Sequence, residues 1–208
     1  MARLSSDAPK ARTKILASRP IDVDAPGILR TQRLALRPLT SRDRAEFLRV
    51  LALNPEQTSP LGLIRAGDSL ERAFERQLEL TREADRTGRA WRRAAFLPAG
   101  QLVGCFNLGE ITRGLCFAGE LSWWLAPDQT GLGYATEGLR AVIDHAMADI
   151  PRGLGLHTLR AHIHPGNVRS LRLALRLGLT HSGGTAQVCG VEGWQTHQVW
   201  ELRISSVA

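Results

Sequence analysis

The sequence predicts a single α/β domain in which helices cover a mixed, mostly antiparallel sheet. Apolar residues make up 43% of the 208 residues, which is enough for a substantial core. Alternating and helical apolar patterns follow one another in the order β-α-α-β-β-β-α-β-α-β-β. A glycine-rich turn joins the fourth of these strands directly to the third helix. No internal repeat or second domain boundary interrupts this order.

The N-terminal part contains a tail, one strand and two helices. Residues 1–27 lack apolar periodicity, so we expect a flexible basic tail before one domain at residues 28–208. The alternation in residues 33–37 predicts a half-buried strand. A helix is expected from Thr40 or Ser41 to about Leu53, and a second from about Ser69 to Thr87, where Gly88 ends it.

The middle of the chain predicts three strands, at about 90–97, 101–109 and 119–125. The glycine loop of residues 129–133 then opens a helix. The apolar positions that repeat at helical spacing in it are Ala135, Leu139, Val142, Ile143, Ala146 and Met147.

The C-terminal part predicts a strand at 156–163, a helix that starts at Asn167 and ends before Gly178, and two strands at about 179–189 and 194–204. The positions of that helix expected to face inward are Val168, Leu171, Ala174, Leu175 and Leu177.

Composition limits the classes of function. The net charge is +7 and comes almost wholly from arginine, because the only lysines are Lys10 and Lys14. Arginine suits phosphate, so the basic surface fits nucleic acid, a ribosome or a polyanionic cofactor, although a merely solvated surface is an equal alternative. No apolar run reaches the roughly 18 to 20 residues that cross a bilayer, and the start lacks a secretory apolar stretch. We expect a cytoplasmic protein without membrane association.

Cysteine and histidine spacing argues against a disulfide framework or a metal site. Cys105, Cys116 and Cys189 lie far apart, and we expect them to be small buried residues. His162 and His164 lie two apart on one strand face, but no third ligand follows at metal spacing. The sequence therefore predicts no metal.

The glycine loop has the form of an anion site. Gly131 and Gly133 precede a helix whose first amide N–H groups lack intrahelical partners, and glycine lets a phosphate approach them closely. The third glycine of the dinucleotide-binding fingerprint is Thr136 here, and no Lys of the Walker type follows. Taken alone, the two glycines could equally serve only the turn.

About thirty residues later comes His164-Pro-Gly-Asn167-Val-Arg-Ser170, and then Leu177-Gly178. With these stretches, with "GELSWWLAP" and "TGLGYATEGLRAVIDHA", and with the opening "LRTQRLALRPLTSRD", the sequence resembles the GCN5-related N-acetyltransferases, and more narrowly their RimJ/RimL-like branch. The likeness spans about residues 29 to 204. It implies a sheet whose central strands splay apart, so that the gap between them forms the coenzyme A cleft.

The resemblance implies a role for each motif. Backbone groups of Trp123, Trp124 and Leu125 would pair with the pantetheine arm, and an N–H near Leu125 would polarise the thioester carbonyl. Asn167 would bind the same arm, or serve only as a helix N-cap. The pyrophosphate would be held by the amides of Gln129, Thr130, Gly131, Leu132, Gly133 and Tyr134.

Several positions depart from the family pattern. Asp128 stands where Gln or Arg is usual, and Thr196 where the last strand often has Asp. Ala174 stands where many members carry a general-acid tyrosine, so Ser170 is the substitute that the branch suggests, with a solvated serine as the alternative.

The general base is left between two carboxylates. Glu120 begins the strand beside the cleft, and Glu110 ends the strand before it. Either could accept a proton through water, and either could be only an exposed surface carboxylate.

The resemblance implies an enzyme that transfers acetyl from acetyl-CoA to an amine by direct attack, without a covalent enzyme intermediate. A protein N-terminal α-amine, as in ribosomal proteins, is the favoured acceptor, with ribosome association as a further expectation and a monomer or homodimer as the assembly. The alternatives are a small amine, such as an aminoglycoside or polyamine, and a non-catalytic acyl-CoA-binding or ribosome-associated module.

Overall fold

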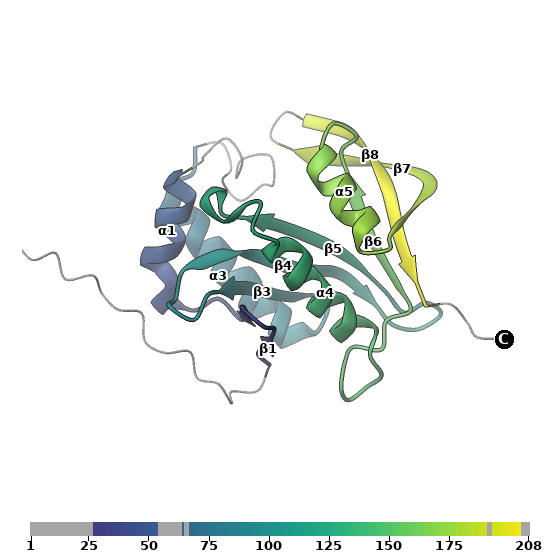
Figure 1. Ribbon diagram of the computed structural model, residues 1–208, viewed down its shortest axis with the longest axis horizontal. Coiled ribbons are helices and arrows are strands. Elements are labelled where there is room, and N and C mark those ends of the chain that lie inside the picture. Colours follow the sequence, from purple (N-terminus) through teal and green to yellow (C-terminus); the bar gives the residue numbers. More distant parts are fainter. Residues whose placement is uncertain (1–26, 54–63, 65–66, 191–192, 205–208) are drawn as a thin grey trace, which may run out of the picture.

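The computed structural model describes residues 27–53, 64, 67–190 and 193–204. These residues form one eight-stranded sheet in the order β1-β2-β3-β4-β5-β6-β8-β7 (Figure 1). Every neighbouring pair is antiparallel except β5 and β6, so the predicted mixed, mostly antiparallel sheet is confirmed. The strands are β1 (Leu29–Arg30), β2 (Ala35–Arg37), β3 (Trp91–Phe96), β4 (Leu102–Thr112), β5 (Ala118–Leu125), β6 (Thr158–Ile163), β7 (Thr180–Gly190) and β8 (Gly193–Arg203). The α-helices are α1 (Arg44–Leu53), α3 (Leu70–Thr87), α4 (Tyr134–Met147) and α5 (Val168–Arg176).

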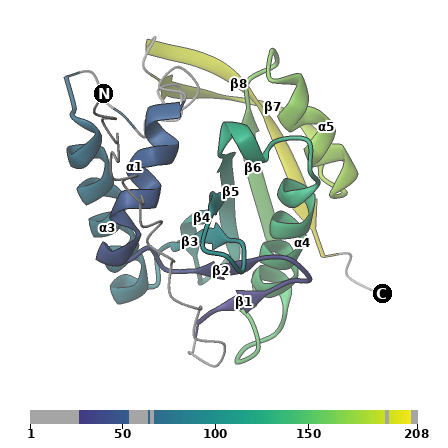
Figure 2. The same ribbon diagram turned by 60° about the vertical axis from the view of Figure 1, so that its left-hand side comes forward.

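Helices cover both faces of the sheet. Helices α1 and α3 lie on one side and α4 and α5 on the other (Figure 2). The α4/α5 side holds the larger core, in which Phe106 and Leu139 are fully buried. The α1/α3 side holds a second core, where the ring of Phe47 lies 5.6 Å from that of Phe74 and 5.9 Å from that of Trp124. The two tryptophans of β5 therefore point to opposite faces, as strand alternation predicts.

The N-terminal segment differs from prediction in detail. Strand β1 was missed, because two residues are too few to show an alternation. The predicted first helix starts as a 3-10 turn, Ser41–Asp43, before α1. The Asp43 carboxylate accepts hydrogen bonds from the N–H and hydroxyl of Thr40 and lies 2.6 Å from Arg37. Burial alone would raise the pKa of Asp43, but these bonds and the charge of Arg37 hold it below its ordinary value.

The predicted bounds of α3 are confirmed by its caps. The Ser69 hydroxyl oxygen accepts a hydrogen bond from the N–H of Arg72 at 3.2 Å. Gly88 has φ of +64°, the left-handed conformation that ends a helix without steric cost. On the other side of the sheet, Gly138 lets α4 lie directly on β4, because a Cβ there would fall 2.7 Å from the ring of Phe106.

The predicted inward face of α5 is wrong in part. Val168 and Leu175 are 50% and 59% exposed, whereas Leu173, which was not predicted to face inward, is buried with Ala174 and Leu177. Leucines stand at every second position from 171 to 177, so the pattern alone does not select one side of the helix.

The cysteines were also placed incorrectly. Cys116 and Cys189 are exposed, the first between β4 and β5 and the second on the edge strand β7. Only Cys105 is enclosed, and burial raises the pKa of its thiol to about 12, against the opposing charge of Arg92. Cys105 is therefore a neutral packing group rather than a nucleophile.

The predicted tail lies outside the described residues, apart from Gly27. The Gly27 carbonyl accepts a hydrogen bond from Nε of Arg93 at 3.2 Å, so the chain already contacts the domain there. None of the helices in the described part of the chain has the length and the apolar composition of a membrane span.

Candidate functional site

The central strands of the sheet separate along their length. Strands β5 and β6 pair only at Ala118–Glu120 and Thr158–Arg160, and Figure 1 shows them diverging beyond that point. One register shift, between Gly109 and Thr112 of β4, lies beside the last paired residues. The splayed strands that the resemblance implied are therefore present, with a gap between the C-terminal halves of β5 and β6.

Backbone groups of β5 face this gap in alternation. The Ala126 N–H donates to the Val103 carbonyl at 2.8 Å, so every second peptide group of β5, including that of Trp124, is directed at β4. The N–H and C=O groups of Trp123 and Leu125 therefore point toward β6, beyond the residues with which β6 pairs. They form an unpaired strand edge that an extended ligand can pair with. By this alternation, the backbone groups of Trp124 face β4 rather than the gap, and its side chain is buried in the α1/α3 core.

The glycine loop presents a cluster of free amides. It begins with a 3-10 turn, Pro127–Gln129, and the Thr130 hydroxyl donates to the Pro127 carbonyl at 3.0 Å. Gly131 and Gly133 have φ of +80° and +84°, which glycine adopts without strain. In the described chain, the N–H groups from Thr130 to Thr136 have no backbone acceptor, because the first bond into α4 comes from Glu137. The Gln129 N–H differs from our expectation, since it donates to the Ala126 carbonyl.

An ion pair between residues far apart in the sequence stabilises this loop. Arg33 lies 2.6 Å from the Glu137 carboxylate, donates to the Leu132 carbonyl at 3.1 Å and covers the ring of Tyr134 at 4.5 Å. Burial alone would raise the pKa of Glu137, but hydrogen bonds from Thr31 and Arg33 hold it below its ordinary value. Arg33 and Glu137 were not among the predicted site residues. They are 104 positions apart, and the only local signal was a charged residue in the first turn of the helix.

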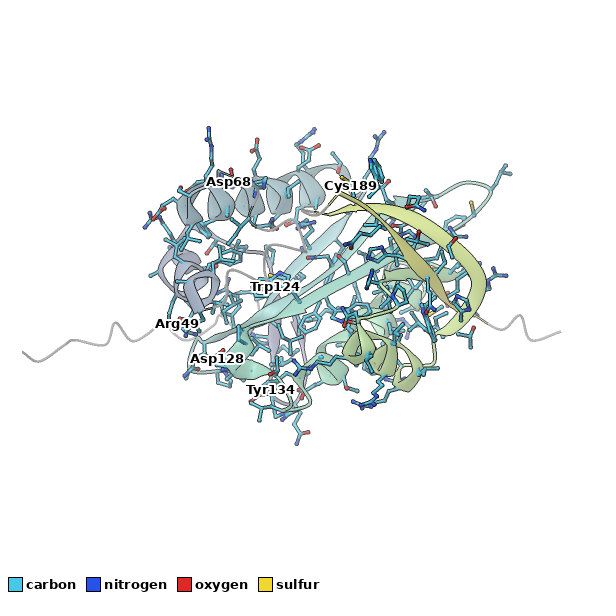
Figure 3. All side chains as sticks on the ribbon, turned by 90° about the horizontal axis from the view of Figure 1, so that it is seen from above. Arg49, Asp68, Trp124, Asp128, Tyr134 and Cys189 are labelled. Carbon is cyan, nitrogen blue, oxygen red and sulfur yellow. The ribbon has the colours of Figure 1, made fainter. Side chains whose placement is uncertain are left out.

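Asp128 does not stand alone beside the loop. Its carboxylate lies 3.4 Å from Nη1 of Arg49, which also pairs with Glu46 at 2.8 Å. Figure 3 shows Arg49 and Asp128 together, with Tyr134 nearby. The positive charge of Arg49 on α1 therefore partly offsets the negative charge that Asp128 brings close to an anion site.

Helix α5 begins shortly after β6, beyond the residues of β6 that pair with β5. Strand β6 ends at Ile163, and the Asn167 side-chain oxygen accepts a hydrogen bond from the Ser170 N–H at 3.1 Å. The N-cap role of Asn167 is thus present, and its amide NH₂ group is still available. The Ser170 hydroxyl is half-buried and has no hydrogen-bond partner among the described residues. Both side chains belong to the first turn of one helix, as predicted.

The two candidate bases have different surroundings. Glu120 lies where β5 and β6 part, and its carboxylate is 3.6 Å from Nδ1 of His162 on β6. Glu110 is exposed, with φ of +44°, at the register shift of β4. His162 was considered only as a metal ligand in the sequence, although strand alternation already placed it on a face beside the gap.

Two further histidines, His164 and His197, lie close to each other beyond the end of β6. The ring of His164 is 5.5 Å from that of His197, and its Nδ1 accepts a hydrogen bond from the Gly166 N–H at 3.1 Å. No group of three His, Cys, Asp or Glu side chains with metal-binding geometry occurs in the described ranges.

These features fit the implied coenzyme. A pyrophosphate needs convergent N–H donors at a helix start, and the free amides of the loop provide them. The pantetheine arm carries amide groups, and the unpaired edge of Trp123 and Leu125 offers the matching donors and acceptors.

Gly131→Val tests the loop. The valine would adopt a left-handed backbone only with strain and would project into open space, since no other side chain lies within 4 Å of its Cβ. We expect coenzyme A affinity to fall at least about tenfold, as measured by calorimetry, because the side chain would occupy the space that phosphate needs.

Gly183→Val is the matched control. Gly183 lies on β7, with φ of +83° and an equally open Cβ position, so the two variants carry a similar backbone cost. It should lower the melting temperature comparably and leave coenzyme A affinity unchanged. Equal affinity in both variants would show that the coenzyme binds elsewhere.

Comparison with known proteins gives the family. The model of the acetyltransferase (GNAT) domain matches residues 33–180, well over half of the chain. YjcK of Bacillus subtilis, whose name describes an N-acetyltransferase, is 26% identical over 175 residues, which is 83% of this chain and 94% of YjcK. An L-methionine sulfoximine/L-methionine sulfone acetyltransferase of Pseudomonas aeruginosa is 36% identical over 92 residues, covering 43% of this chain and 51% of that enzyme.

Solved structures share the fold. Mycobacterium smegmatis RimJ in complex with CoA-disulfide matches with a TM-score of 0.70, at 23% identity over 84% of this chain and 83% of RimJ. The spermidine N-acetyltransferase of Vibrio cholerae, in complex with CoA and spermine, matches with a TM-score of 0.64, at 20% identity over 82% of this chain and 95% of that one. The splayed sheet, the loop of free amides and the family match over residues 33–180 together show that this chain belongs to the GNAT family of acetyltransferases.

Proposed function

We propose that the chain transfers the acetyl group of acetyl-CoA to the α-amine at the N-terminus of a protein. The observation that carries this proposal is the parting of β5 and β6 after Glu120 and Arg160, beside a loop of unpaired amides. An extended coenzyme and an acceptor amine can meet in such a gap from opposite faces of the sheet.

Each group of the site has a chemical task in this proposal. Acetyl-CoA supplies an activated thioester. The Leu125 N–H donates a hydrogen bond to the carbonyl oxygen as it gains negative charge. Ser170 gives a proton to the departing sulfur, and Glu120 with His162 takes one from the amine. The high pKa of Cys105 argues against an acyl-cysteine intermediate on that residue.

An α-amine suits the base that the site offers. The reference pKa of an α-amine is near 8, against about 10.4 for a lysine side chain, so an α-amine loses its proton more readily. A partly exposed carboxylate such as Glu120 can therefore serve as its base. The net charge of +7 also disfavours polycationic acceptors such as polyamines. Ribosomal-protein acetyltransferases among the similar structures support the same class of acceptor. The excess of arginine also suits association with the ribosome.

A free amino acid is the second candidate acceptor. The relative from Pseudomonas aeruginosa is named for L-methionine sulfoximine and L-methionine sulfone, which are amino acids with an α-amine. A chain that binds acetyl-CoA without turnover is the alternative from a different class.

Release of coenzyme A against a panel of amines tests the proposal. The panel pairs an unblocked peptide with the same peptide acetylated at its N-terminus, and adds L-methionine sulfone, spermidine and an aminoglycoside. We expect release with the unblocked peptide only, and one acetyl group on its first residue by mass spectrometry.

Release with spermidine or the aminoglycoside alone would overturn the proposed acceptor. Release with L-methionine sulfone alone would favour the free amino acid. Coenzyme binding without release from any amine would favour the binding module.

A further inference from the structure

Three polar positions form a row across the sheet on the α1/α3 side. Arg92 of β3 pairs with Asn107 of β4, and Asn107 pairs with Ser122 of β5. The next row of the same face, which includes Cys105 and Trp124, packs into the core under α1 and α3. The polar row therefore lies at the border of that core, two residues from Glu120 along β5.

Arg92 is an enclosed cation without an acid. Other enclosed arginines of the domain each have one: Arg37 pairs with Asp43, Arg76 with Asp68 and Arg93 with Asp85. Arg92 instead donates only to the side-chain oxygen of Gln77 on α3, at 2.7 Å, and no carboxylate of the described chain is within ion-pair distance. Burial lowers the pKa of Arg92, which reflects the cost of a charge held away from water without a counter-charge.

Two neighbouring side chains also lack partners. Asn107 is only 7% exposed, and within the described residues no hydrogen bond satisfies its amide. The indole N–H of Trp124 is buried without an acceptor, and Figure 3 places Trp124 between α3 and the strands. Among the described residues, the Trp124 N–H is the one fully buried side-chain donor without an acceptor, whereas the Asn107 amide keeps some contact with solvent. Buried polar groups are normally satisfied, so an enclosed cation without a carboxylate, beside an accessible amide without a partner, indicates a binding surface for an anion.

We propose that Arg92 and Asn107 form a subsite for a carboxylate of the acceptor, which rests on the proposed function. Strands lie about 4.8 Å apart, so the Arg92 backbone is roughly 10 Å from that of Ser122 beside the gap. The carboxylate must therefore stand several bonds from the amine. An acidic second residue of a peptide meets this requirement, and so does the C-terminal carboxylate of a short peptide. The α-carboxylate of a free amino acid is too close to its own amine.

Matched peptides test the subsite. One pair begins Ala-Glu or Ala-Gln within a longer chain, and a second pair is a dipeptide with a free or an amidated C-terminus, so that the two pairs distinguish the two carboxylate sources. We expect wild type to prefer the acidic member of one pair by about 10- to 100-fold in kcat/KM, mainly through KM. Arg92→Gln should abolish that preference by weakening the acidic peptide alone.

Arg93→Gln is the matched control. Arg93 is the next residue, but its guanidinium lies over the ring of Trp91 at 4.6 Å and pairs with Asp85 at 2.8 Å, so its loss should lower stability but keep the acidic preference. Arg92→Gln should keep or raise the melting temperature, because it removes an uncompensated charge.

Equal use of acidic and neutral peptides by wild type would overturn the subsite while leaving the acetyltransferase intact. A preference that persists in Arg92→Gln would overturn it too. If no peptide is acetylated, calorimetry of the same peptides on the coenzyme-A-loaded protein decides. Tighter binding of the acidic member, lost in Arg92→Gln, supports the subsite, and equal or undetectable binding of both overturns it.

Discussion

Ser170→Ala is expected to lower kcat by about 10²- to 10⁴-fold while coenzyme A affinity changes little. The Ser170 hydroxyl is half-buried on the first turn of α5, where β6 has separated from β5. A hydroxyl without a partner there is free to protonate a departing thiolate. That contact matters mainly in the transition state, so its loss should appear in kcat. Single-turnover kinetics and calorimetry measure the two quantities.

The Ser170→Ala substitution removes the hydroxyl without removing the hydrogen bond that caps α5. The bond that caps α5 uses the Ser170 backbone N–H, and alanine keeps it, so the helix should keep its start. The remaining family positions cannot replace the hydroxyl, because Ala174 is fully buried and apolar and Tyr134 lies at the start of α4 under Arg33.

Ser182→Ala is the control. The Ser182 hydroxyl donates to the Val199 carbonyl at 3.0 Å on the β7 edge, so its loss should leave kcat unchanged. Ser170→Thr, which keeps a hydroxyl, should recover part of the rate. A near-normal kcat in Ser170→Ala would move the proton to water or to another residue.

Local sequence rules predicted most elements of the fold. The bounds of α3 could be predicted because Ser69 and Gly88 act within a few residues of the helix ends. The buried side of α5 could not, because packing against the sheet decided among leucines that the sequence spaces evenly. Exposure of Cys116 and Cys189 likewise follows from their places in a connection and on an edge strand, which composition does not specify.

In the candidate site, too, local features could be predicted from the sequence and long-range contacts could not. The turn at Gly131 and Gly133 and the helix start at Asn167 could be predicted from the sequence, because each depends on local backbone conformation or on a single helix turn. The ion pair of Arg33 with Glu137 and the neighbouring positions of Arg92 and Asn107 could not be predicted. Both depend on how segments far apart in the sequence pack together in the fold. The opposite directions of the Trp123 and Trp124 backbone groups could be assigned only from the hydrogen-bond register of β4 and β5.

Glu120→Gln is expected to lower kcat/KM by about 10²-fold at pH 7. The variant keeps size and polarity at the start of the gap but removes the carboxylate that lies 3.6 Å from His162. Glu110→Gln is the matched control, because Glu110 is exposed at the register shift and makes no ion pair in the described chain. It should retain wild-type kinetics, so the two variants decide between the two candidate bases.

The pH dependence separates a base from a structural residue. An acceptor α-amine has a reference pKa near 8, so it arrives mainly protonated at pH 7 and mainly neutral above about pH 9. A base that removes that proton is needed most at low pH, so the defect of Glu120→Gln should narrow as pH rises. His162→Gln, which removes only the partner, should give a smaller loss with the same trend. A defect that stays constant from pH 6 to pH 9.5 would instead mean that Glu120 supports the shape of the gap, and that water accepts the proton.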